Sequence, residues 1–461
     1  MIEGLKPYSE YKESGQEWLG KVPAHWDVRR TKLILREVDS RSTTGKEQLL
    51  RVSQYTGVTQ RKAADGSDAP DTRAASLVGY KRVSVNDLVI TIMLAWNGSM
   101  GVSRFDGIAS PAYCVYRLNK GAQPWFFHQL FRLPLYKGRI KAVSTGVIES
   151  RLRLYSDDLG RIEAILPPPD EQAAIVRFLD HANRKIDGFI RAKRKLIGLL
   201  NEQKQAIIHR AVTRGLNPDV PLKPSGIPWL GDIPQHWGLV RNMALFAHRV
   251  EPGIAELPVL QVSLRSGITA EELDQFGRPK RLIADATKYK RIHRGDVAYN
   301  TMRMWQGAVG VSPTDGLVSP AYVVLKPRQE TCPEFYDFIF HTEVYKQQVN
   351  RQSTGIVSDR NRLYWDSFKQ MPNLTLPKTE QEEIVAFIRA ETTTINTAIT
   401  RTEREIALMQ EYRTRLTADI VTGKLDVREA AAHLPAPPAD AVTEATADEP
   451  LEEIETEEIE A

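Results

Sequence analysis

The 461-residue chain is poor in cysteine and has no long apolar segment. Its two cysteines, Cys114 and Cys332, stand in no CxxC or Cys/His cluster, so neither a disulfide framework nor a zinc site is predicted. No run of about 18 apolar residues could span a membrane, and the first 15 residues lack the apolar core of a signal peptide. We therefore expect a cytoplasmic protein without membrane-spanning helices.

Recognisable catalytic motifs are also missing. The sequence contains no GxxxxGK[ST] phosphate loop, no Asn/Asp-Pro-Pro-aromatic segment, no HExxH and no GxSxG. The remaining candidates are His25 and His236, each followed by tryptophan. Both belong to a block that occurs twice in the chain, which favours a packing role over catalysis. We expect a non-catalytic chain, with an active site of scattered acidic residues, as in some nucleases, as the open alternative.

Acidic residues are scarce along most of the chain and crowded at its end. Residues 430–461 hold ten Asp and Glu side chains and no Lys or Arg. Residues 1–429 carry 62 basic and 48 acidic side chains, a net charge of +14. A basic body favours a polyanionic partner, with an ordinary solvated surface as the alternative. The acidic tail, residues 429–461, is predicted to be disordered.

The same blocks of sequence occur twice, in the same order, about 210 residues apart. The matched blocks are SGQEWLGKVPAHW (14–26) with SGIPWLGDIPQHW (225–237), VSQYTGVT (52–59) with VSLRSGIT (262–269), residues 80–113 with 289–322, STGVIESRLRLY (144–155) with STGIVSDRNRLY (353–364), and PPPDEQAAIVRFL (167–179) with LPKTEQEEIVAFI (376–388). So many blocks in one order indicate the duplication of a whole unit.

Each copy has a mixed part followed by a helical part. The mixed part contains short apolar runs typical of strands, such as 88–94 and 112–118, and helical segments such as 136–143 and 345–352. These features predict an α+β fold. The predicted divisions are globular domain 1 (1–168), long helix 1 (169–216), globular domain 2 (217–377) and long helix 2 (378–428).

Both helical parts carry a seam of residues spaced alternately by four and three. The seams are Ile175, Leu179, Ala182, Ile186, Phe189, Lys193, Leu196, Leu200, Gln203 and Ile207 in the first helix, and Ile384, Ile388, Glu391, Ile395, Ala398, Thr402, Glu405, Met409, Tyr412 and Leu416 in the second. A helix of about 45 residues is ~65 Å long, and two such seams favour pairing of the helices with each other. The alternative is that each helix packs only on its own globular domain.

Residues suited to DNA contact gather in three pairs of regions. The first are the loops 60–79 and 270–288, and the second are the segments 90–100 and 299–309, where Gln306 replaces Asn97 and Arg303 replaces Leu94. Arg, Asn and Gln can pair with guanine or adenine edges through two hydrogen bonds. The third are the Ser-Thr-Gly turns with their following arginines, which suit phosphate contact. The predicted DNA-binding residues are Arg61, Lys62, Asn97, Ser144, Thr145, Arg151, Arg153, Arg278, Lys280, Arg303, Gln306, Ser353, Thr354, Arg360 and Arg362. Loop drift after duplication, and arginines serving as structural ion-pair partners, are the alternatives.

Over residues 14–428 the chain resembles the specificity (S) subunit of type I restriction–modification systems. The resemblance rests on the two WLG-x-[IV]-P-x-H-W boxes, the two blocks that end in Ser-Pro-Ala-Tyr and the two E-Q-x-x-I-V helix starts. It implies two target recognition domains, each of which reads half of an asymmetric bipartite DNA site. It also implies that the two long helices form an antiparallel coiled coil that sets the distance between the half-sites.

The resemblance further implies a set of partners and no catalysis by this chain. The expected partners are double-stranded DNA, two methyltransferase (M) subunits and restriction (R) subunits. S-adenosylmethionine, ATP and Mg²⁺ are expected on those subunits, and no cofactor or metal is expected on this chain. Three other readings stay open: an enzyme component with an unseen active site, a specificity module of another methylation-based defence complex, and a scaffold that does not bind DNA.

Overall fold

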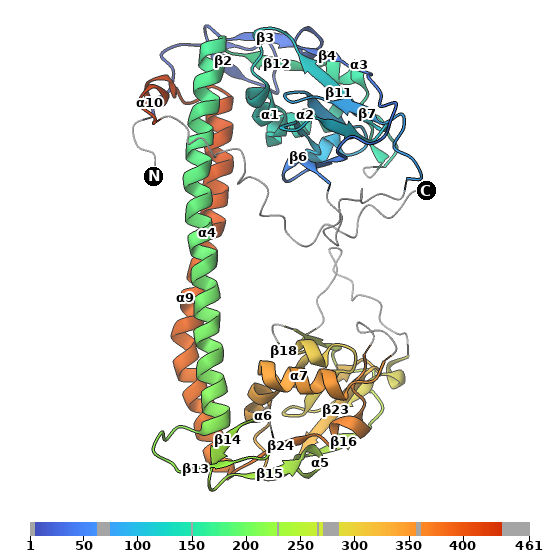
Figure 1. Cartoon of the computed structure of the whole chain (residues 1–461), viewed down its shortest axis with the longest axis vertical. Coiled ribbons are helices and arrows are strands. Elements are labelled where there is room, and N and C mark those ends of the chain that lie inside the picture. Colours follow the sequence, from blue (N-terminus) through green and yellow to red (C-terminus); the bar gives the residue numbers. More distant parts are fainter. Residues whose placement is uncertain are drawn as a thin grey trace. The chain divides into compact units, whose positions relative to one another are not determined.

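The computed structural model describes residues 5–61, 74–148, 151–227, 230–264, 267–270, 285–355 and 361–435. The chain forms two compact units, unit 1 (1–192 with 405–461) and unit 2 (193–404). The boundary between the units falls inside both long helices, α4 (Pro169–Arg214) and α9 (Lys378–Val421) (Figure 1). Each unit therefore contains one globular part and about half of each long helix.

Unit 1 is built on a four-stranded antiparallel sheet. In sheet order its strands are β4 (Leu35–Glu37), β11 (Tyr113–Leu118), β8 (Leu88–Thr91) and β9 (Met100–Val102). The sequence Leu-Val-Ile-Thr of β8 suits a strand because β-branched side chains pack well on a pleated surface, and all four residues are buried. The segment predicted as a strand over 88–94 leaves the sheet after Thr91, where the chain enters a turn.

Smaller pairs of strands and short helices complete the globular part of unit 1. The paired strands are β1 (Tyr11–Glu13) with β2 (Lys21–Pro23), β3 (Asp27–Arg30) with β12 (Glu163–Leu166), β5 (Leu50–Ser53) with β6 (Gly57–Gln60), and β7 (Lys81–Val83) with β10 (Gly107–Ala109). The helices are η1 (Thr31–Leu33), η2 (Ala95–Asn97), α1 (Pro124–Arg132), α2 (Pro134–Val143) and α3 (Ser156–Arg161).

Unit 2 repeats this arrangement strand by strand. Its four-stranded sheet has the order β16 (Phe246–Arg249), β23 (Tyr322–Pro327), β20 (Val297–Asn300) and β21 (Val309–Val311). The paired strands are β13 (Leu222–Pro224) with β14 (Asp232–Pro234), β15 (Gly238–Arg241) with β24 (Pro372–Thr375), β17 (Leu260–Ser263) with β18 (Gly267–Ala270), and β19 (Lys290–Ile292) with β22 (Gly316–Val318). The helices are α5 (Asn242–Leu245), η4 (Ala286–Lys288), η5 (Met304–Gln306), α6 (Pro333–Phe340), α7 (Glu343–Gln352) and α8 (Trp365–Phe368).

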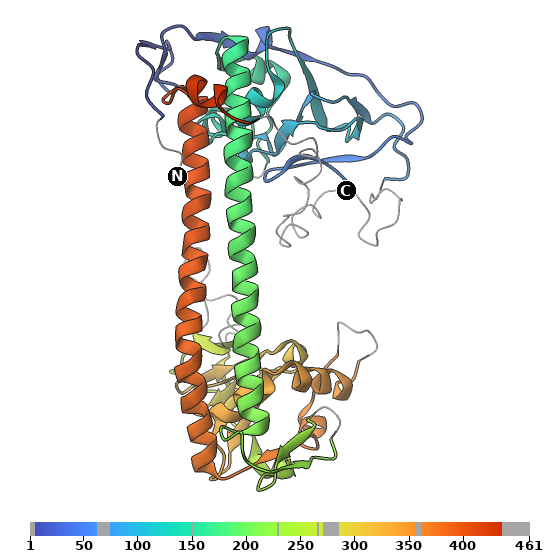
Figure 2. The ribbon, with the colours of Figure 1, turned by 60° about the vertical axis from the view of Figure 1, so that its left-hand side comes forward.

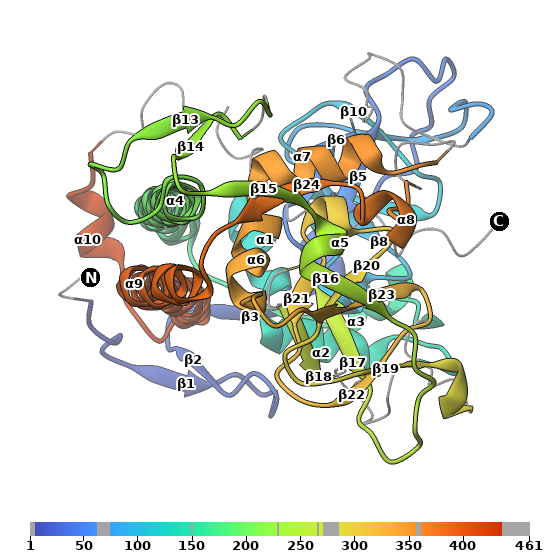
Figure 3. The ribbon, with the colours of Figure 1, turned by 90° about the horizontal axis from the view of Figure 1, so that it is seen from below.

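The matching topologies confirm the predicted α+β fold and its tandem duplication. In both units one strand of the four-stranded sheet, β11 or β23, pairs with two others. On one side it pairs with β4 or β16, and on the other with β8 or β20, the first strand of a hairpin. Helix α6 lies against β21 (Figure 3), and α7 lies against η5. The same contacts join α1 to β9 and α2 to η2 in unit 1.

Each hydrophobic core contains the start of one long helix and the end of the other. In unit 1, Ile175 and Leu179 of α4 join Leu416 and Ile420 of α9 in the core. In unit 2, the core contains the end of α4, residues 208–212, and the start of α9, residues 384–388. The helices therefore run antiparallel beside each other within each unit (Figure 2), and the alternative, in which a helix packs only on its own domain, is wrong.

Polar contacts link the same helices. In unit 1 the Arg413 guanidinium pairs with the Asp187 carboxylate, and in unit 2 the Lys204 Nζ donates to Asn396 Oδ1 at 2.9 Å. The predicted seam is only partly followed: Ile395 and Thr402 are buried as predicted, but Leu196 and Gln203 are exposed, and Thr392 is buried whereas Glu391 is exposed. A straight helix of 3.6 residues per turn drifts by about 20° per heptad from a 3.5-residue repeat, so a strict heptad extrapolation loses the buried face.

Both long helices end at a glycine with a left-handed backbone. Gly215 follows α4 with φ 73°, and Gly423 lies just beyond α9 with φ 79°, the conformation that glycine adopts without strain. Helix α9 therefore ends at Val421, short of the predicted residue 428. The predicted acidic tail also begins too early, because α10 (Arg428–Ala432) buries Ala431 in the core of unit 1. Residues 436–461 lie outside the described residues.

The two His-Trp boxes anchor the first turns of the long helices. In unit 1, Glu171 accepts hydrogen bonds from Trp26 Nε1 at 2.9 Å and His25 Nε2 at 2.8 Å. Tyr8 also donates to this carboxylate, and burial together with that hydrogen bond raises the pKa of Tyr8. In unit 2, Glu380 accepts from Trp237 Nε1 at 3.0 Å and His236 Nε2 at 2.9 Å.

The residue after each glutamate ties the helix to the globular part. Gln172 accepts from the Gln123 amide at 2.8 Å and donates to the Pro167 carbonyl at 2.7 Å. Gln381 accepts from the Cys332 amide at 2.8 Å and donates to the Leu376 carbonyl at 2.9 Å. The histidines and tryptophans of the repeated boxes thus hydrogen-bond the first turns of the long helices, and the Glu-Gln pair of each helix start holds the globular part on its helix.

Candidate nucleic-acid interface

The turn between the last two strands of each four-stranded sheet has the same backbone in both units. It covers residues 92–99 in unit 1 and 301–308 in unit 2, and we call these segments the recognition turns. Each contains one short helical turn, η2 or η5, followed by a glycine with φ 99°. The start of each turn accepts a hydrogen bond from a distant amide: Leu154 N to Ile92 O and Leu363 N to Thr301 O, both at 2.9 Å.

Three of the predicted DNA-binding residues, Asn97, Arg303 and Gln306, lie on these turns. Arg303 and Gln306 are exposed, and their side chains form no hydrogen bond or ion pair with the described residues. Asn97 is half-buried, and its Oδ1 accepts from Ser99 N at 3.0 Å and from Ser99 Oγ at 2.8 Å. The two turns therefore present different chemistry from one backbone.

The Ser-Thr-Gly turns lie next to the recognition turns, at the ends of α2 and α7. Thr145 pairs with Arg153 through two backbone hydrogen bonds of 3.0 and 2.8 Å, and Thr354 pairs with Arg362 in the same way. Gly146 is required here, because a Cβ atom would lie 2.7 Å from the Arg151 carbonyl oxygen. Small residues thus fold the chain back so that each arginine stands beside the turn.

Several predicted phosphate-contacting side chains are available for binding. Thr145, Arg151 and Arg153 are exposed in unit 1, as are Thr354 and Arg362 in unit 2. None of these side chains forms an ion pair within the described residues, so the alternative of structural ion-pair partners finds no support for Arg151, Arg153 and Arg362.

Ser144 and Ser353 differ from their neighbours. The Ser144 hydroxyl donates to the Ile140 carbonyl at 2.7 Å, and the Ser353 hydroxyl donates to the Val349 carbonyl at the same distance. A hydroxyl has one proton, so these serines cap the ends of α2 and α7 and cannot donate to a phosphate at the same time.

The first predicted loop begins at the end of the hairpin β5–β6. Arg61 is half-buried, and its amide donates to the Leu49 carbonyl at 2.9 Å, which places it at the edge of that hairpin. Lys62 lies outside the described residues, and so do Arg278 and Lys280 in the corresponding loop. Arg360, which follows the second Ser-Thr-Gly turn, is also outside them.

Arg132 of α1 fixes this hairpin and the recognition turn of unit 1 together. Its guanidinium donates to carbonyl oxygens of the hairpin, at Ser53, Gln54 and Tyr55, and of the recognition turn and its next strand, at Gly98 and Met100. Burial lowers the pKa of Arg132 to about 10, which leaves it charged at neutral pH. Sequence patterns did not single out this residue, although it positions two predicted contact regions.

Unit 2 carries a different pair at the same place in the repeat. Asp337 and His341 correspond to His128 and Arg132. Asp337 Oδ1 lies 3.5 Å from His341 Nδ1 and accepts no hydrogen bond from the described residues. Burial, with a contribution from Glu334, raises the pKa of Asp337 to about 6, against the lowering effect of His341.

Replacing Asp337 with asparagine should stabilise the protein only at the higher pH values. The raised pKa means that the folded chain favours the neutral carboxyl. Its contribution to the free energy of unfolding is fully present below pH ~4 and is lost as the pH rises through about 6. Asp337→Asn should therefore raise the free energy of unfolding by about 1–3 kcal/mol at pH 8 and leave it unchanged at pH 4. Urea unfolding at both pH values measures this.

The exposed Asp366, which pairs with Lys369, supplies the matched control. Asp366→Asn should bring no gain at pH 8, because the pKa of this carboxyl is lowered by Lys369. An equal gain for Asp337→Asn at pH 4 and pH 8 would show that its effect does not come from titration.

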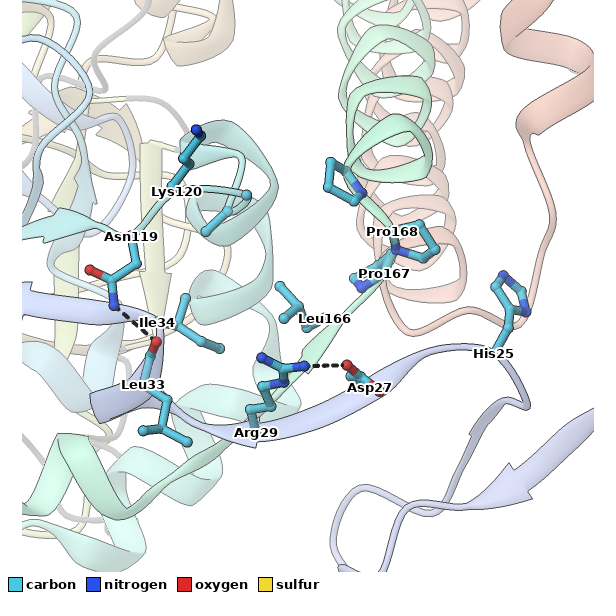
Figure 4. A pocket seen from close by; sticks show the side chains of 13 residues that line it. His25, Asp27, Arg29, Leu33, Ile34, Asn119, Lys120, Leu166, Pro167 and Pro168 are labelled. Carbon is cyan, nitrogen blue, oxygen red and sulfur yellow. Dashed lines mark hydrogen bonds and ion pairs between the residues drawn. The ribbon is translucent and has the colours of Figure 1, made fainter.

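A pocket of about 310 Å³ opens beside the start of α4 in unit 1 (Figure 4). Two pairs of its lining residues are hydrogen-bonded to each other: Arg29 donates to Asp27 at 2.7 Å, and Asn119 Nδ2 donates to the Leu33 carbonyl at 2.9 Å. Its lining shows no pairing of a nucleophile with a base, so we assign it no catalytic role. Over the described ranges, no group of His, Cys, Asp and Glu has metal-binding geometry and no helix could cross a membrane.

Comparison with solved structures relates this architecture to known proteins. A chain from a study of complex assembly and conformational transition of the type I restriction–modification system has a TM-score of 0.62 and 16% identity. The match covers 88% of this chain and 99% of that chain. The protein has the fold of a type I restriction–modification chain. No protein-family model matches the sequence, and a search of curated proteins found no match.

Two further solved structures show weaker similarity. The HsdS subunit from Thermoanaerobacter tengcongensis is 16% identical, with a TM-score of 0.44 and coverage of 90% of this chain and 100% of that chain. The S subunit of a type I restriction–modification system from M. genitalium is 10% identical, with a TM-score of 0.32 and coverage of 87% and 96%.

Proposed function

We propose that the chain is the DNA-specificity subunit of a type I restriction–modification complex. Units 1 and 2 act as target recognition domains, and each reads one half of a bipartite, asymmetric DNA site. The observation that carries the proposal is the duplicated fold, which matches a chain of such a system over 88% of this chain and nearly all of that one.

The surfaces of the two units support separate half-sites. Their frameworks agree strand by strand, whereas exposed positions of the recognition turns differ, as Arg303 and Leu94 show. The exposed arginines beside both Ser-Thr-Gly turns suit phosphate contact, which supplies affinity without sequence preference. One scaffold with two sets of surface side chains favours an asymmetric site over a palindrome.

The chemistry belongs to partner subunits in this proposal. Two M subunits methylate adenine N6 with S-adenosylmethionine, and R subunits use ATP and Mg²⁺ for restriction, while this chain binds double-stranded DNA and no cofactor. The duplicated anchors, Trp26–Glu171 and Trp237–Glu380, give both units the same framework. Two equivalent surfaces on one chain can bind two identical partners.

Methylation mapping of DNA from a host tests the proposal. The host expresses this chain together with its neighbouring M subunit, and a second host expresses M alone. We expect an N6-methyladenine motif with two unlike halves that appears only when this chain is present. If both proteins are soluble and associated but no new motif appears, the DNA-targeting function is refuted and a scaffold role is favoured. Methylation or cleavage by the purified chain alone would instead identify an enzyme.

Arg153 and Arg362 are expected to contact phosphates in unit 1 and unit 2. Replacing either with glutamine should weaken binding of the S–M complex to all DNA sequences alike. The slope of log K against log salt should become shallower by about 1 for each variant, as measured by fluorescence anisotropy at several salt concentrations. A loss confined to one DNA sequence, with an unchanged salt slope, would assign the arginine to base contact.

A further inference from the structure

We infer that the two recognition turns read DNA by different chemistry. In unit 2, Arg303 and Gln306 pair with purine edges through hydrogen bonds, whereas in unit 1 the same turn offers apolar contact from Met93 and Leu94, and Asn97 shapes the turn. This inference rests on the proposed function and names the side chains that make the two half-sites differ.

The comparison between the turns is direct because their backbones agree. Leu94 has φ −119° and ψ 15°, and Arg303, at the same position, has φ −125° and ψ 9°. Both residues accept the amide hydrogens of the third and fifth residues after them, at 3.2 Å each in unit 1 and at 3.0 and 3.1 Å in unit 2. Corresponding side chains therefore leave the turn at corresponding places, and differences in reading come from side-chain chemistry.

Asn97 is unable to pair with adenine as asparagine usually does. That contact needs the amide oxygen to accept from the adenine N6 group while the amide nitrogen donates to N7. A carboxamide oxygen has two lone pairs, and both sites on Asn97 Oδ1 are used by the amide and hydroxyl of Ser99. The sequence-based assignment of Asn97 as a base reader is therefore not supported by the geometry of the turn.

Among the described residues of unit 2, no hydrogen bonds correspond to the two that Ser99 donates to Asn97 Oδ1. Ala308 replaces Ser99 and has no hydroxyl, and Gln306 is one methylene longer than Asn97. The exposed side chains of Arg303 and Gln306 form no hydrogen bond or ion pair with the described residues. Trp305 Nε1 donates to the Met302 carbonyl at 3.0 Å, which ties the turn together beneath them.

These groups define the kind of base pair that each turn can read. The planar guanidinium of Arg303 matches the O6 and N7 acceptors of guanine, and the free amide of Gln306 matches N6 and N7 of adenine. Met93 and Leu94 are partly exposed and can contact the methyl group of thymine, which is apolar. Unit 2 should therefore require a purine with defined hydrogen-bonding groups at the base pair that its turn contacts. Unit 1 should require an apolar group, such as the thymine methyl, at the base pair that its own turn contacts.

The test uses the complete S–M complex with five variants of this chain, one of which, Asn97→Ala, removes the side chain that shapes the turn of unit 1. Arg303→Leu places the residue of unit 1 in unit 2, Arg303→Lys keeps the charge but removes the two-pronged donor, and Gln306→Ala removes the amide. Arg294→Leu is the charge-matched control, since Arg294 is an exposed arginine of unit 2 outside the turn. Methylation mapping gives the motif, binding to a panel of DNA duplexes gives discrimination, and a thermal melt confirms that each variant is folded.

We expect Arg303→Leu and Gln306→Ala each to relax one base pair in one half-site, with discrimination there falling about 5- to 150-fold. Arg303→Lys should relax the same base pair as Arg303→Leu, and Arg294→Leu should relax none. Asn97→Ala should weaken binding to all sequences equally and relax no position.

Three results would overturn the inference while leaving the proposed function intact. The first is an unchanged motif in Arg303→Leu and Gln306→Ala. The second is uniform weakening with a shallower salt slope, which would make Arg303 a phosphate contact. The third is a relaxed adenine in the other half-site in Asn97→Ala. Absence of any motif with the unaltered chain would instead refute the proposed function.

Discussion

Replacing Trp26 with alanine is expected to lower the free energy of unfolding of unit 1 by about 3–5 kcal/mol. The indole is fully buried between the start of α4 and the end of α9, where a Cβ atom on Gly423 would lie only 2.8 Å from its ring. Its removal leaves a cavity and also takes a donor from Glu171, a carboxylate that is only 2% exposed. Trp237→Ala should also destabilise unit 2, because that indole is fully buried and donates to Glu380.

Hydrogen exchange followed by mass spectrometry measures this effect for each unit separately. Trp26→Ala should increase exchange in unit 1, and Trp237→Ala in unit 2. The control is Trp26→Phe, which keeps an aromatic ring but loses the N–H group, and it should cost about 1–3 kcal/mol because Glu171 loses one partner. If Trp26→Ala left the exchange of unit 1 unchanged, the anchor would not be a source of stability.

Lengthening both long helices by seven residues is expected to change the spacer of the DNA motif and leave both half-sites unchanged. The insertions belong between Ala192 and Lys193 in α4 and between Arg404 and Glu405 in α9, where the two compact units divide. Seven residues add about 10 Å of helix and return nearly to the same helix face, with a drift of about 20°. An added length of about 10 Å corresponds to at most about three base-pair steps of ~3.4 Å.

Methylation mapping of the lengthened chain with its M subunit gives the new spacer directly. A chain with seven substituted but not inserted residues, chosen from exposed positions of the same helices, is the control and should keep the original spacer. The coiled-coil ruler proposal fails if the lengthened chain is folded and active but methylates sites of the original spacing.

The sequence predicted those parts of the molecule that rest on local or repeated patterns. Matched blocks in one order required a duplication, and β-branched runs such as 88–91 formed the buried strands. Long stretches without proline formed α4 and α9, and each helix is followed by a glycine with a left-handed backbone, although Gly188 and Gly198 lie inside α4.

Only the tertiary structure decided which groups meet and which remain free. Trp26 and Glu171 are 145 residues apart, and Arg132 reaches carbonyls on two different segments, so no local pattern predicts either contact. In the middle of α4, the exposed Leu196 and Gln203 departed from the heptad extrapolation for the same reason, because packing and not spacing selects the buried face. Asn97 and Gln306 occupy equivalent positions in the sequence, yet the turn brings the Ser99 hydroxyl onto the Asn97 oxygen, whereas the Gln306 side chain forms no hydrogen bond with the described residues. Composition and order therefore determine the scaffold, and hydrogen-bond geometry in three dimensions determines which side chains are available to a partner.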